Sequence, residues 1–416
     1  MKSFKHHLSE AAKGGKNTHM THIEDLVIYG GVKGAREAIL ALRSLRDMLA
    51  GNAKNSTDVT VKWDGAPAVF AGIDPQDGQF FVAKKGIFNK NPKVYKSHAD
   101  IEADTGGDLQ TKLKVAFDEL SKLGITGVVQ GDIMFTNSDL KSETIDGDKF
   151  ITFHPNTIVY ALAADSEEAK KVKAARIGVV FHTEYSGATF ETMTASYGVD
   201  VSKFKSVSSV WAQTATIKDL SGTVNFTKAD TDEVTKALSE AGKIFQKIAG
   251  STLKTIEANQ EFAGIIETYG NTFVRKNQVI GDTKKHVDGL IQYVKDKYQK
   301  EADKRSTEAG KSSQFKKRDE LLAFFDTKNK ANLKLVFDLQ KAIVAAKLII
   351  INKLSRMGSI NTFVKTKNGF KVTGQEGFVA IDRIGGGAVK LVDRLEFSTN
   401  NFSPDILKGW DTPSRS

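Results

Sequence analysis

Charged residues of the kinds that catalyse group transfer recur on predicted strands along this chain. They are Lys62 and Asp64 (followed by Gly65) in "VTVKWDGAPAVFAG", Asp132 in "GVVQGDIMF", Glu376 before "GFVAI", and Lys390 in "GAVKLVDRLEF". A lysine amine becomes a nucleophile when burial or a nearby cation lowers its pKa and frees its lone pair. Carboxylates near such an amine can bind magnesium or accept hydrogen bonds from sugar hydroxyls. These residue types predict covalent catalysis at Lys62 if the fold brings them together.

The local sequence around Lys62 also has a simpler interpretation. Alternation over residues 59–63 places Val59, Val61 and Trp63 on one face of a strand and Lys62 on the other. An Asp-Gly pair between two strands is typical of a hairpin turn. On this interpretation Lys62 is a solvated strand lysine, and only the other charged residues favour a catalytic role.

Hydrophobic periodicity predicts both strands and helices. Strands are expected over 59–63, 68–73, 79–84 and 127–135 and within 359–397, where Lys367–Gly369 predicts a hairpin turn. Helices are expected over 31–50, 108–124, 230–249, 252–269, 282–305, 314–326 and 330–356. The simplest architecture is an α+β domain rich in antiparallel strands and interrupted by a large all-α insertion.

Near residue 230 the predicted secondary structure changes from mainly strands to nearly all helix, which suggests four segments. They are a polar N-terminal segment with a helix (1–54), the first part of the sheet domain (55–228), a helical insertion (229–358), and the last strands with the tail (359–416). The chain has no cysteine, no apolar run long enough to span a bilayer, and no apolar core in its basic N-terminus. These features predict a cytoplasmic protein without disulfides and without a membrane partner.

Positive charge is concentrated in the helical insertion. The chain carries a formal net charge of +10, and residues 282–358 hold 18 Lys and Arg against 10 Asp and Glu. A basic surface of this kind predicts contact with nucleic-acid phosphates, and Lys316, Lys317 and Arg318 are the candidates. A set of solvated lysine-rich helices is the alternative.

The order of the strand-borne residues resembles the covalent nucleotidyltransferase superfamily of ATP-dependent polynucleotide ligases and, more distantly, mRNA capping enzymes. Its first motif, Lys-x-Asp-Gly, matches Lys62-Trp63-Asp64-Gly65, and its third, an apolar strand with Gly-Glu, is similar to Gly131-Asp132. Its fourth motif matches Glu376-Gly377-Phe378-Val379, and its fifth, Lys-x-Lys, is matched in part by Lys390-Leu391-Val392. The whole chain also resembles an uncharacterised family of large tailed phages of marine bacteria.

The resemblance implies a ligase-type, ATP-grasp-like adenylation domain that uses ATP and magnesium. Lys62 would attack the α-phosphate of ATP to form a lysyl-AMP intermediate. The resemblance assigns nucleotide contacts as follows: Asp64 and Gly65 in the first motif, Asp132 on the ribose, Tyr160 stacked on the base, Lys84 or Lys85 and Lys390 on phosphate, and Glu376 on magnesium.

Two departures from the family pattern narrow the expected activity. Val392 stands where the second lysine of the fifth motif is expected, and Arg394 is the candidate replacement. Only 19 residues follow Phe397, too few for the OB-fold domain that follows this motif in DNA ligases and capping enzymes. The resemblance therefore favours an RNA ligase that seals 5′-phosphate to 3′-hydroxyl ends.

Other functions remain open at this stage. A DNA ligase or another nucleotidyltransferase would use the same first step, whereas the missing lysine permits a non-catalytic phage nucleic-acid-binding protein with a degenerate ligase fold. His19, His22 and Asp25 have helical spacing that could hold a metal, although a polar helix face is the simpler interpretation. His182 after the strand "IGVVF" is either a substrate contact or a satisfied loop histidine.

Overall fold

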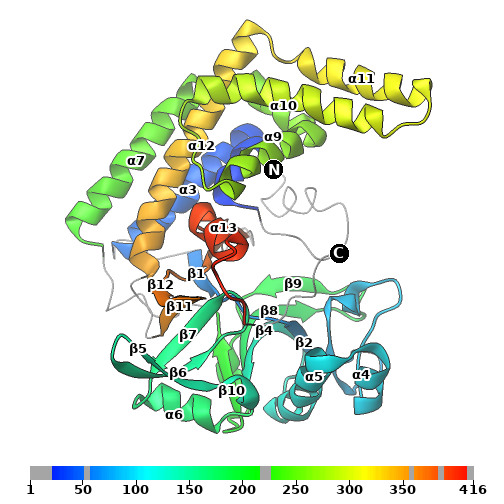
Figure 1. The fold of residues 1–416 in the computed structure, drawn as a ribbon, viewed down its shortest axis with the longest axis vertical. Coiled ribbons are helices and arrows are strands. Elements are labelled where there is room, and N and C mark those ends of the chain that lie inside the picture. The colour runs from blue at the N-terminus through cyan, green and yellow to red at the C-terminus, as the bar shows by residue number, and fades with distance from the viewer. Residues whose placement is uncertain (1–20, 51–56, 216–225, 356–359, 383–387, 410–416) are drawn as a thin grey trace.

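The computed structural model describes residues 21–50, 57–215, 226–355, 360–382 and 388–409. Helices gather on one side of the molecule and most strands on the other (Figure 1). The C-terminal helix α13 (Arg394–Phe402) lies between the two groups. This arrangement sets a helical block against a group of sheets.

The helical block consists mainly of residues 226–355. Its helices are α7 (Lys228–Lys247), α8 (Gly250–Ala258), α9 (Gln260–Arg275), α10 (Thr283–Asp303), α11 (Glu308–Leu322) and α12 (Thr327–Leu354). The predicted single helix over 252–269 is wrong, because the chain leaves helical geometry at Asn259. The side chain of Asn259 accepts a hydrogen bond from the Phe262 N–H and so begins a new helix there.

N-terminal residues share the core of this block. They form η1 (Ile23–Asp25), α2 (Leu26–Tyr29) and α3 (Gly31–Leu49). Buried side chains such as Leu42 and Leu45 of α3 belong to the same apolar cluster as Leu238 of α7 and Ile343 of α12. None of the described helices is long and apolar enough to cross a membrane. The predicted division into four segments stays a prediction.

The strands form three sheets. The first has the order β1-β13-β14 and contains β1 (Thr57–Lys62), β13 (Gly377–Asp382) and β14 (Ala388–Leu391). The second has the order β10-β8-β4-β2-β3, with β9 beside β8: β2 (Ala68–Ile73), β3 (Phe80–Ala83), β4 (Val128–Thr136), β8 (Ile177–Ser186), β9 (Thr194–Tyr197) and β10 (Val210–Thr214). The third has the order β12-β11-β7-β6-β5: β5 (Lys141–Ile145), β6 (Asp148–Phe153), β7 (Ile158–Ala163), β11 (Asn361–Thr366) and β12 (Gly369–Val372).

Antiparallel pairing dominates these sheets. Among the named strands, β8 and β10 run parallel and the other pairs run antiparallel. The second sheet is covered by α5 (Gly107–Leu120), and the shorter helices α4 (His98–Asp104) and α6 (Glu167–Ala174) lie at the periphery (Figure 1). The prediction of a mixed fold with mainly antiparallel strands is confirmed.

The predicted hairpin around Asp64-Gly65 is wrong. β1 pairs with β13, whereas β2 pairs with β3 and β4, so the segment between β1 and β2 crosses from one sheet to another. Val59 and Val61 do pack on the helical block, as the alternation predicts. Trp63 lies beyond the end of β1 and packs in a different cluster, against Tyr160.

The C-terminal residues differ from their prediction in one respect. The hairpin at Lys367–Gly369 is confirmed, since β11 and β12 pair with Thr366 opposite Gly369. The last predicted strand, however, ends at Leu391. The Asp393 side chain accepts hydrogen bonds from the Leu395 and Glu396 N–H groups, which begins α13 in place of further strand.

Candidate active site

The amine of Lys62 lies at the end of β1, directly against the carboxylate of Glu376. Lys62 is opposite Gly377 in the β1–β13 register, so Glu376 precedes the residue facing it. The Lys62 Nζ donates a hydrogen bond to Glu376 Oε1 in a close ion pair. The Glu376 side chain is only 7% exposed, while that of Lys62 is 28% exposed. A buried carboxylate therefore holds an amine that solvent can still reach.

Lys390 projects from the same face of this three-stranded sheet. Lys62 is opposite Gly377 of β13, and Lys390 is opposite Val379 of the same strand. Positions 377 and 379 are two residues apart and so lie on one face of the sheet. Burial, and the positive charges of Lys62 and Arg394, lower the pKa of Lys390. The other face of the sheet, with Phe378 and Leu391, packs on the helical block.

The protonation of Glu376 is set by its burial. Burial raises its pKa to about 7, although the adjacent Lys62 acts in the opposite direction and Asp64 reinforces the rise. A carboxylate with this pKa can both accept and release a proton near neutrality. Glu376 is therefore placed to exchange a proton with the Lys62 amine.

Asp132 lies on β4, close enough to Lys62 for their charges to interact. Burial raises its pKa, while the charges of His182, Lys62 and Lys85 oppose the rise. His182 Nε2 lies 3.7 Å from Asp132 Oδ2. A β-carbon on Gly65 would come within 2.5 Å of the Asp132 β-carbon, so only glycine lets the segment after β1 pass this close to β4. The Lys-x-Asp-Gly motif and the Gly131-Asp132 motif are therefore in contact at Gly65 and Asp132.

The carboxylate of Asp64 accepts hydrogen bonds from other residues of the protein. One of its carboxylate oxygens accepts from the Asn156 side-chain amide at 2.8 Å, and the other accepts from the Thr157 and Ile158 N–H groups at 2.7 and 2.9 Å. The side chain is buried. In this structure Asp64 holds the end of the Lys62 segment against the start of β7.

Tyr160 is likewise part of the protein interior. Its side chain is fully buried, and its ring stacks on Phe153 at a centroid distance of 5.4 Å with Trp63 at 5.0 Å. Its hydroxyl accepts a hydrogen bond from the Asp64 N–H at 2.7 Å. No face of the ring is open to a base in this conformation, so the structure does not favour the predicted stacking role.

Of the two lysines considered for phosphate contact, Lys85 is the better placed. Lys84 Nζ is engaged by Asp104 Oδ2 at 3.1 Å and lies over the ring of Tyr95. Lys85 is exposed, and its charge acts on Asp132. A phosphate bound between Lys62 and Asp132 would therefore lie within electrostatic reach of Lys85.

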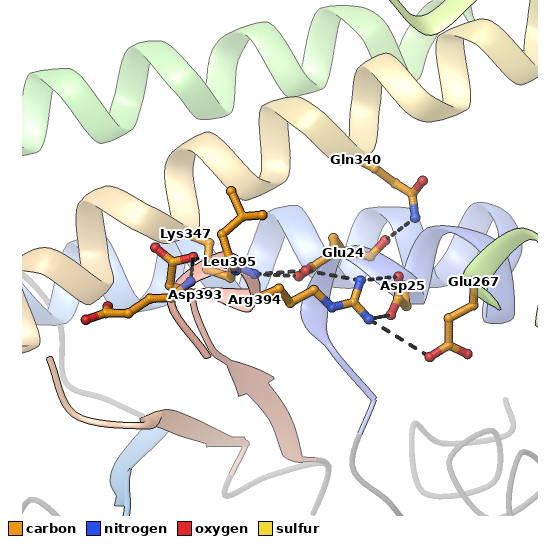
Figure 2. Close-up of polar contacts among 9 residues, drawn as sticks. Glu24, Asp25, Glu267, Gln340, Lys347, Asp393, Arg394 and Leu395 are labelled. Carbon is orange, nitrogen blue, oxygen red and sulfur yellow. Dashed lines mark hydrogen bonds and ion pairs between the residues drawn. The ribbon is translucent and has the colours of Figure 1, made fainter. Parts of the chain in front are cut away.

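Arg394 does not take the place of the missing lysine of the fifth motif. Its guanidinium forms an ion pair with the buried carboxylate of Asp25, with 3.3 Å from Nη1 to Oδ1 (Figure 2). Burial disfavours the charged guanidinium, but Asp25 and Glu24 raise the pKa of Arg394. Val392 is buried. Lys390 is therefore the cation that the fifth motif contributes to the site.

The structure places the other candidates as follows. Lys316 and Lys317 are exposed on α11, far along the chain from Lys62, and Arg318 bonds Asp319 and lies over the ring of Phe315.

His19 lies outside the described residues, and Asp25, which the predicted metal face requires, is bound to Arg394. Within the described part of the chain, no three His, Asp or Glu side chains gather as a metal site.

The sequence analysis left one residue of this site undecided and did not predict one contact within it. His182, for which the sequence left a substrate contact and a satisfied loop position open, faces the acidic side of the site. The direct pairing of Lys62 with Glu376 follows from the β1–β13 register, which no local pattern reveals. The one sequence signal for this pair is that a lysine lies near the end of one predicted strand and a glutamate directly precedes another.

The chain belongs to a family of unknown function (DUF6267), whose model matches residues 17–405. No curated protein and no solved structure matched the chain. The family name carries no activity. The function must therefore be inferred from the geometry of the site.

Proposed function

We propose that the protein is an ATP-dependent polynucleotide ligase that forms a covalent lysyl-AMP intermediate on Lys62, with RNA favoured as substrate. The observation that carries this proposal is the meeting of Lys62, Glu376 and Lys390 on one sheet, with Asp132 close enough for its charge to act on Glu376. A nucleophilic amine, a proton acceptor and phosphate-binding cations are what nucleotidyl transfer requires. The ligase-type fold belongs to the same proposal.

The first step follows from the contacts of Lys62. Its ammonium group passes a proton to the carboxylate of Glu376, which frees the nitrogen lone pair. The nitrogen then forms a bond to the α-phosphorus of ATP, the bond to the bridging oxygen breaks, and pyrophosphate leaves. The second proton on the new P–N nitrogen is released to solvent. Lys390 and Lys85 are placed to neutralise the charge on the phosphate oxygens.

The carboxylates fit the usual manner of magnesium binding. Magnesium commonly takes one or two protein carboxylates and completes its coordination with phosphate oxygens and water. Glu376 and Asp132 lie close enough for the charge of Asp132 to raise the pKa of Glu376. Asp132 would supply a carboxylate oxygen throughout the first step, whereas Glu376 would supply one only while it does not carry the Lys62 proton. When bound, magnesium would stabilise charge on the phosphate oxygens.

Transfer to nucleic acid completes the proposed reaction. AMP passes from Lys62 to a 5′-phosphate end, and a 3′-hydroxyl then attacks that phosphate and displaces AMP. The basic residues of α10 and α11 support a substrate with a phosphate backbone, because such residues bind phosphates without reading sequence. The same first step would also serve a DNA ligase or a nucleotidyltransferase that stops at transfer.

Covalent labelling tests the proposal directly. The protein is incubated with α-labelled ATP and magnesium, denatured, and examined for acid-labile label. We expect label on the native protein and on Lys149→Ala, an exposed strand lysine outside the site, and none on Lys62→Ala. Absence of label with each of the four nucleoside triphosphates would overturn the proposal and favour the non-catalytic nucleic-acid-binding alternative. A chase with nicked RNA, nicked DNA or single-stranded ends then identifies the substrate.

A further inference from the structure

Lys390 lies on a strand that has a neighbour on each side. β14 pairs with β13 on one side, with Val379 opposite Lys390. On the other side, the Lys390 N–H donates to the Thr21 carbonyl at 3.1 Å, and His22 lies opposite Lys390 in parallel register. The backbone of Lys390 is therefore fixed by the segment of residues 21–25, here named the N-terminal strap, which ends with η1.

Side chains join the same two segments a few residues further on. Arg394, four residues after Lys390, bonds both carboxylate oxygens of Asp25 at the end of the strap. Its guanidinium also lies 3.6 Å from Glu24 and 3.9 Å from Glu267 of α9 (Figure 2). The strap and the β14–α13 junction are thus held together by backbone and by charge.

The strap is in turn anchored in the helical block. Lys347 of α12 donates to both carboxylate oxygens of Glu24 at 2.9 Å, and Gln340 donates to the Glu24 carbonyl at 3.2 Å. Glu24 and Lys347 are 3% and 1% exposed. Burial opposes the ionisation of Glu24, but Lys347 and Arg394 lower its pKa to about 2. Glu24 is therefore ionised throughout the physiological range.

A network of this kind is a poor source of stability. Desolvation of buried ions offsets most of their attraction, and a well-packed apolar pair of similar size is often as stable. Ion pairs and hydrogen bonds are directional, so they fix the relative position of two segments more strictly than apolar contacts do. Here they fix the position of the strand that carries Lys390.

We infer that the N-terminal strap positions Lys390 for its contact with the reacting phosphate, with Asp25 and Arg394 as the positioning residues. The inference rests on the proposed function for the role of Lys390. It also connects the helical block to the active site. Lys347 and Gln340 of α12 bind Glu24 of the strap, and Glu267 of α9 lies near Arg394. The strap and Arg394 in turn contact the segment that contains β14. Neither Asp25 nor Arg394 needs to touch substrate.

Two variants separate positioning from stability. Asp25→Asn removes one charge and leaves Arg394 without its main partner. Asp25→Leu with Arg394→Met replaces the ion pair by an apolar pair. We expect the single variant to lose thermal stability and the double variant to recover it. We expect both to form the lysyl-AMP label at least about tenfold more slowly at saturating ATP, because displacement of a catalytic group by about 1 Å can cost more than that.

The matched control lies at the end of the same helix α12. Lys353→Met breaks an ion pair with Asp230 and should label at the native rate. Hydrogen exchange of the peptide that contains Lys390 should accelerate in both strap variants and not in the control. A double variant that labels at the native rate, or unchanged exchange at Lys390, would overturn the inference. If the native protein takes no label, the proposed function fails, and the exchange measurement still decides whether the strap fixes β14.

Discussion

Lys62 and Glu376 lie 314 residues apart in the sequence and form a direct ion pair in the folded chain. The pair exists because β1 and β13 are antiparallel neighbours with Lys62 opposite Gly377. The long helical block is inserted between these two strands without separating them. The chemistry of the site therefore depends on the pairing of two strands from opposite ends of the chain.

The rate of lysyl-AMP formation should rise with pH through about 7. Burial raises the pKa of Glu376 to about 7, so its carboxylate is protonated below that pH and cannot accept the Lys62 proton. One unit below the pKa, only about a tenth of the carboxylates are ionised. A pH profile of the labelling rate checks this, and Glu376→Gln should lower the rate and remove the inflection. An inflection that persists in Glu376→Gln would assign it to another group.

Removal of Lys85 should weaken ATP binding. Lys85 is exposed near Asp132, and loss of a charged hydrogen-bond donor to phosphate costs about 1.5–3 kcal/mol. Lys85→Ala should therefore raise the ATP concentration for half-maximal labelling by at least about tenfold. The matched control is Lys149→Ala, since Lys149 is an exposed lysine of β6. Equal behaviour of the two variants would contradict the assignment of Lys85.

Replacement of Asp64 should destabilise the fold whether or not ATP is present. Asp64→Ala leaves the buried Thr157 and Ile158 N–H groups without their acceptor, and each unsatisfied donor costs about 1–3 kcal/mol. Denaturant unfolding should show this decrease in stability, whereas Asp148→Ala at an exposed position should be close to native. Native stability in Asp64→Ala, with labelling alone impaired, would instead make Asp64 a nucleotide ligand.

The basic residues of α11 should govern the salt dependence of nucleic-acid binding. Lys316 and Lys317 are exposed on a helix whose only buried residue is Leu321, and α11 extends with α10 away from the sheets (Figure 1). Substitution of Lys316, Lys317 and Arg318 by Ala should flatten the slope of log affinity against log salt. The expected change is about 0.7 for each phosphate of a single strand that the variant no longer neutralises.

The control for this surface removes the same number of charges elsewhere. Lys170, Lys171 and Lys173 are exposed on α6, at the opposite end of the molecule (Figure 1). Their replacement by Ala should leave the salt slope nearly unchanged. Affinity that stays constant across salt in both the native protein and the α11 variant would show that the basic helices are a solvated surface and do not bind nucleic acid.

Local patterns determined most elements of this fold. Apolar periodicity placed α7, α10, α12 and the strands β2, β3 and β4 close to their observed bounds, because each pattern reports which face of an element is buried. It did not find the start of α11, which begins at Glu308 and not at residue 314. It also placed Val59 and Val61 on the core face of β1, with Lys62 on the other. Failures occurred where one side chain decides the boundary, as with the helix caps Asn259 and Asp393.

Tertiary structure decided how the candidate residues are used. The motif order supplied Lys62, Asp132, Glu376 and Lys390, but it did not separate residues that face the site from residues that hold it. Asp64 and Tyr160 are bound by the protein, and Arg394 is bound by Asp25, because the pairing of distant segments gives each of them a buried partner. Side-chain type fixes which chemistry is possible, whereas strand register and burial fix which groups are free to perform it.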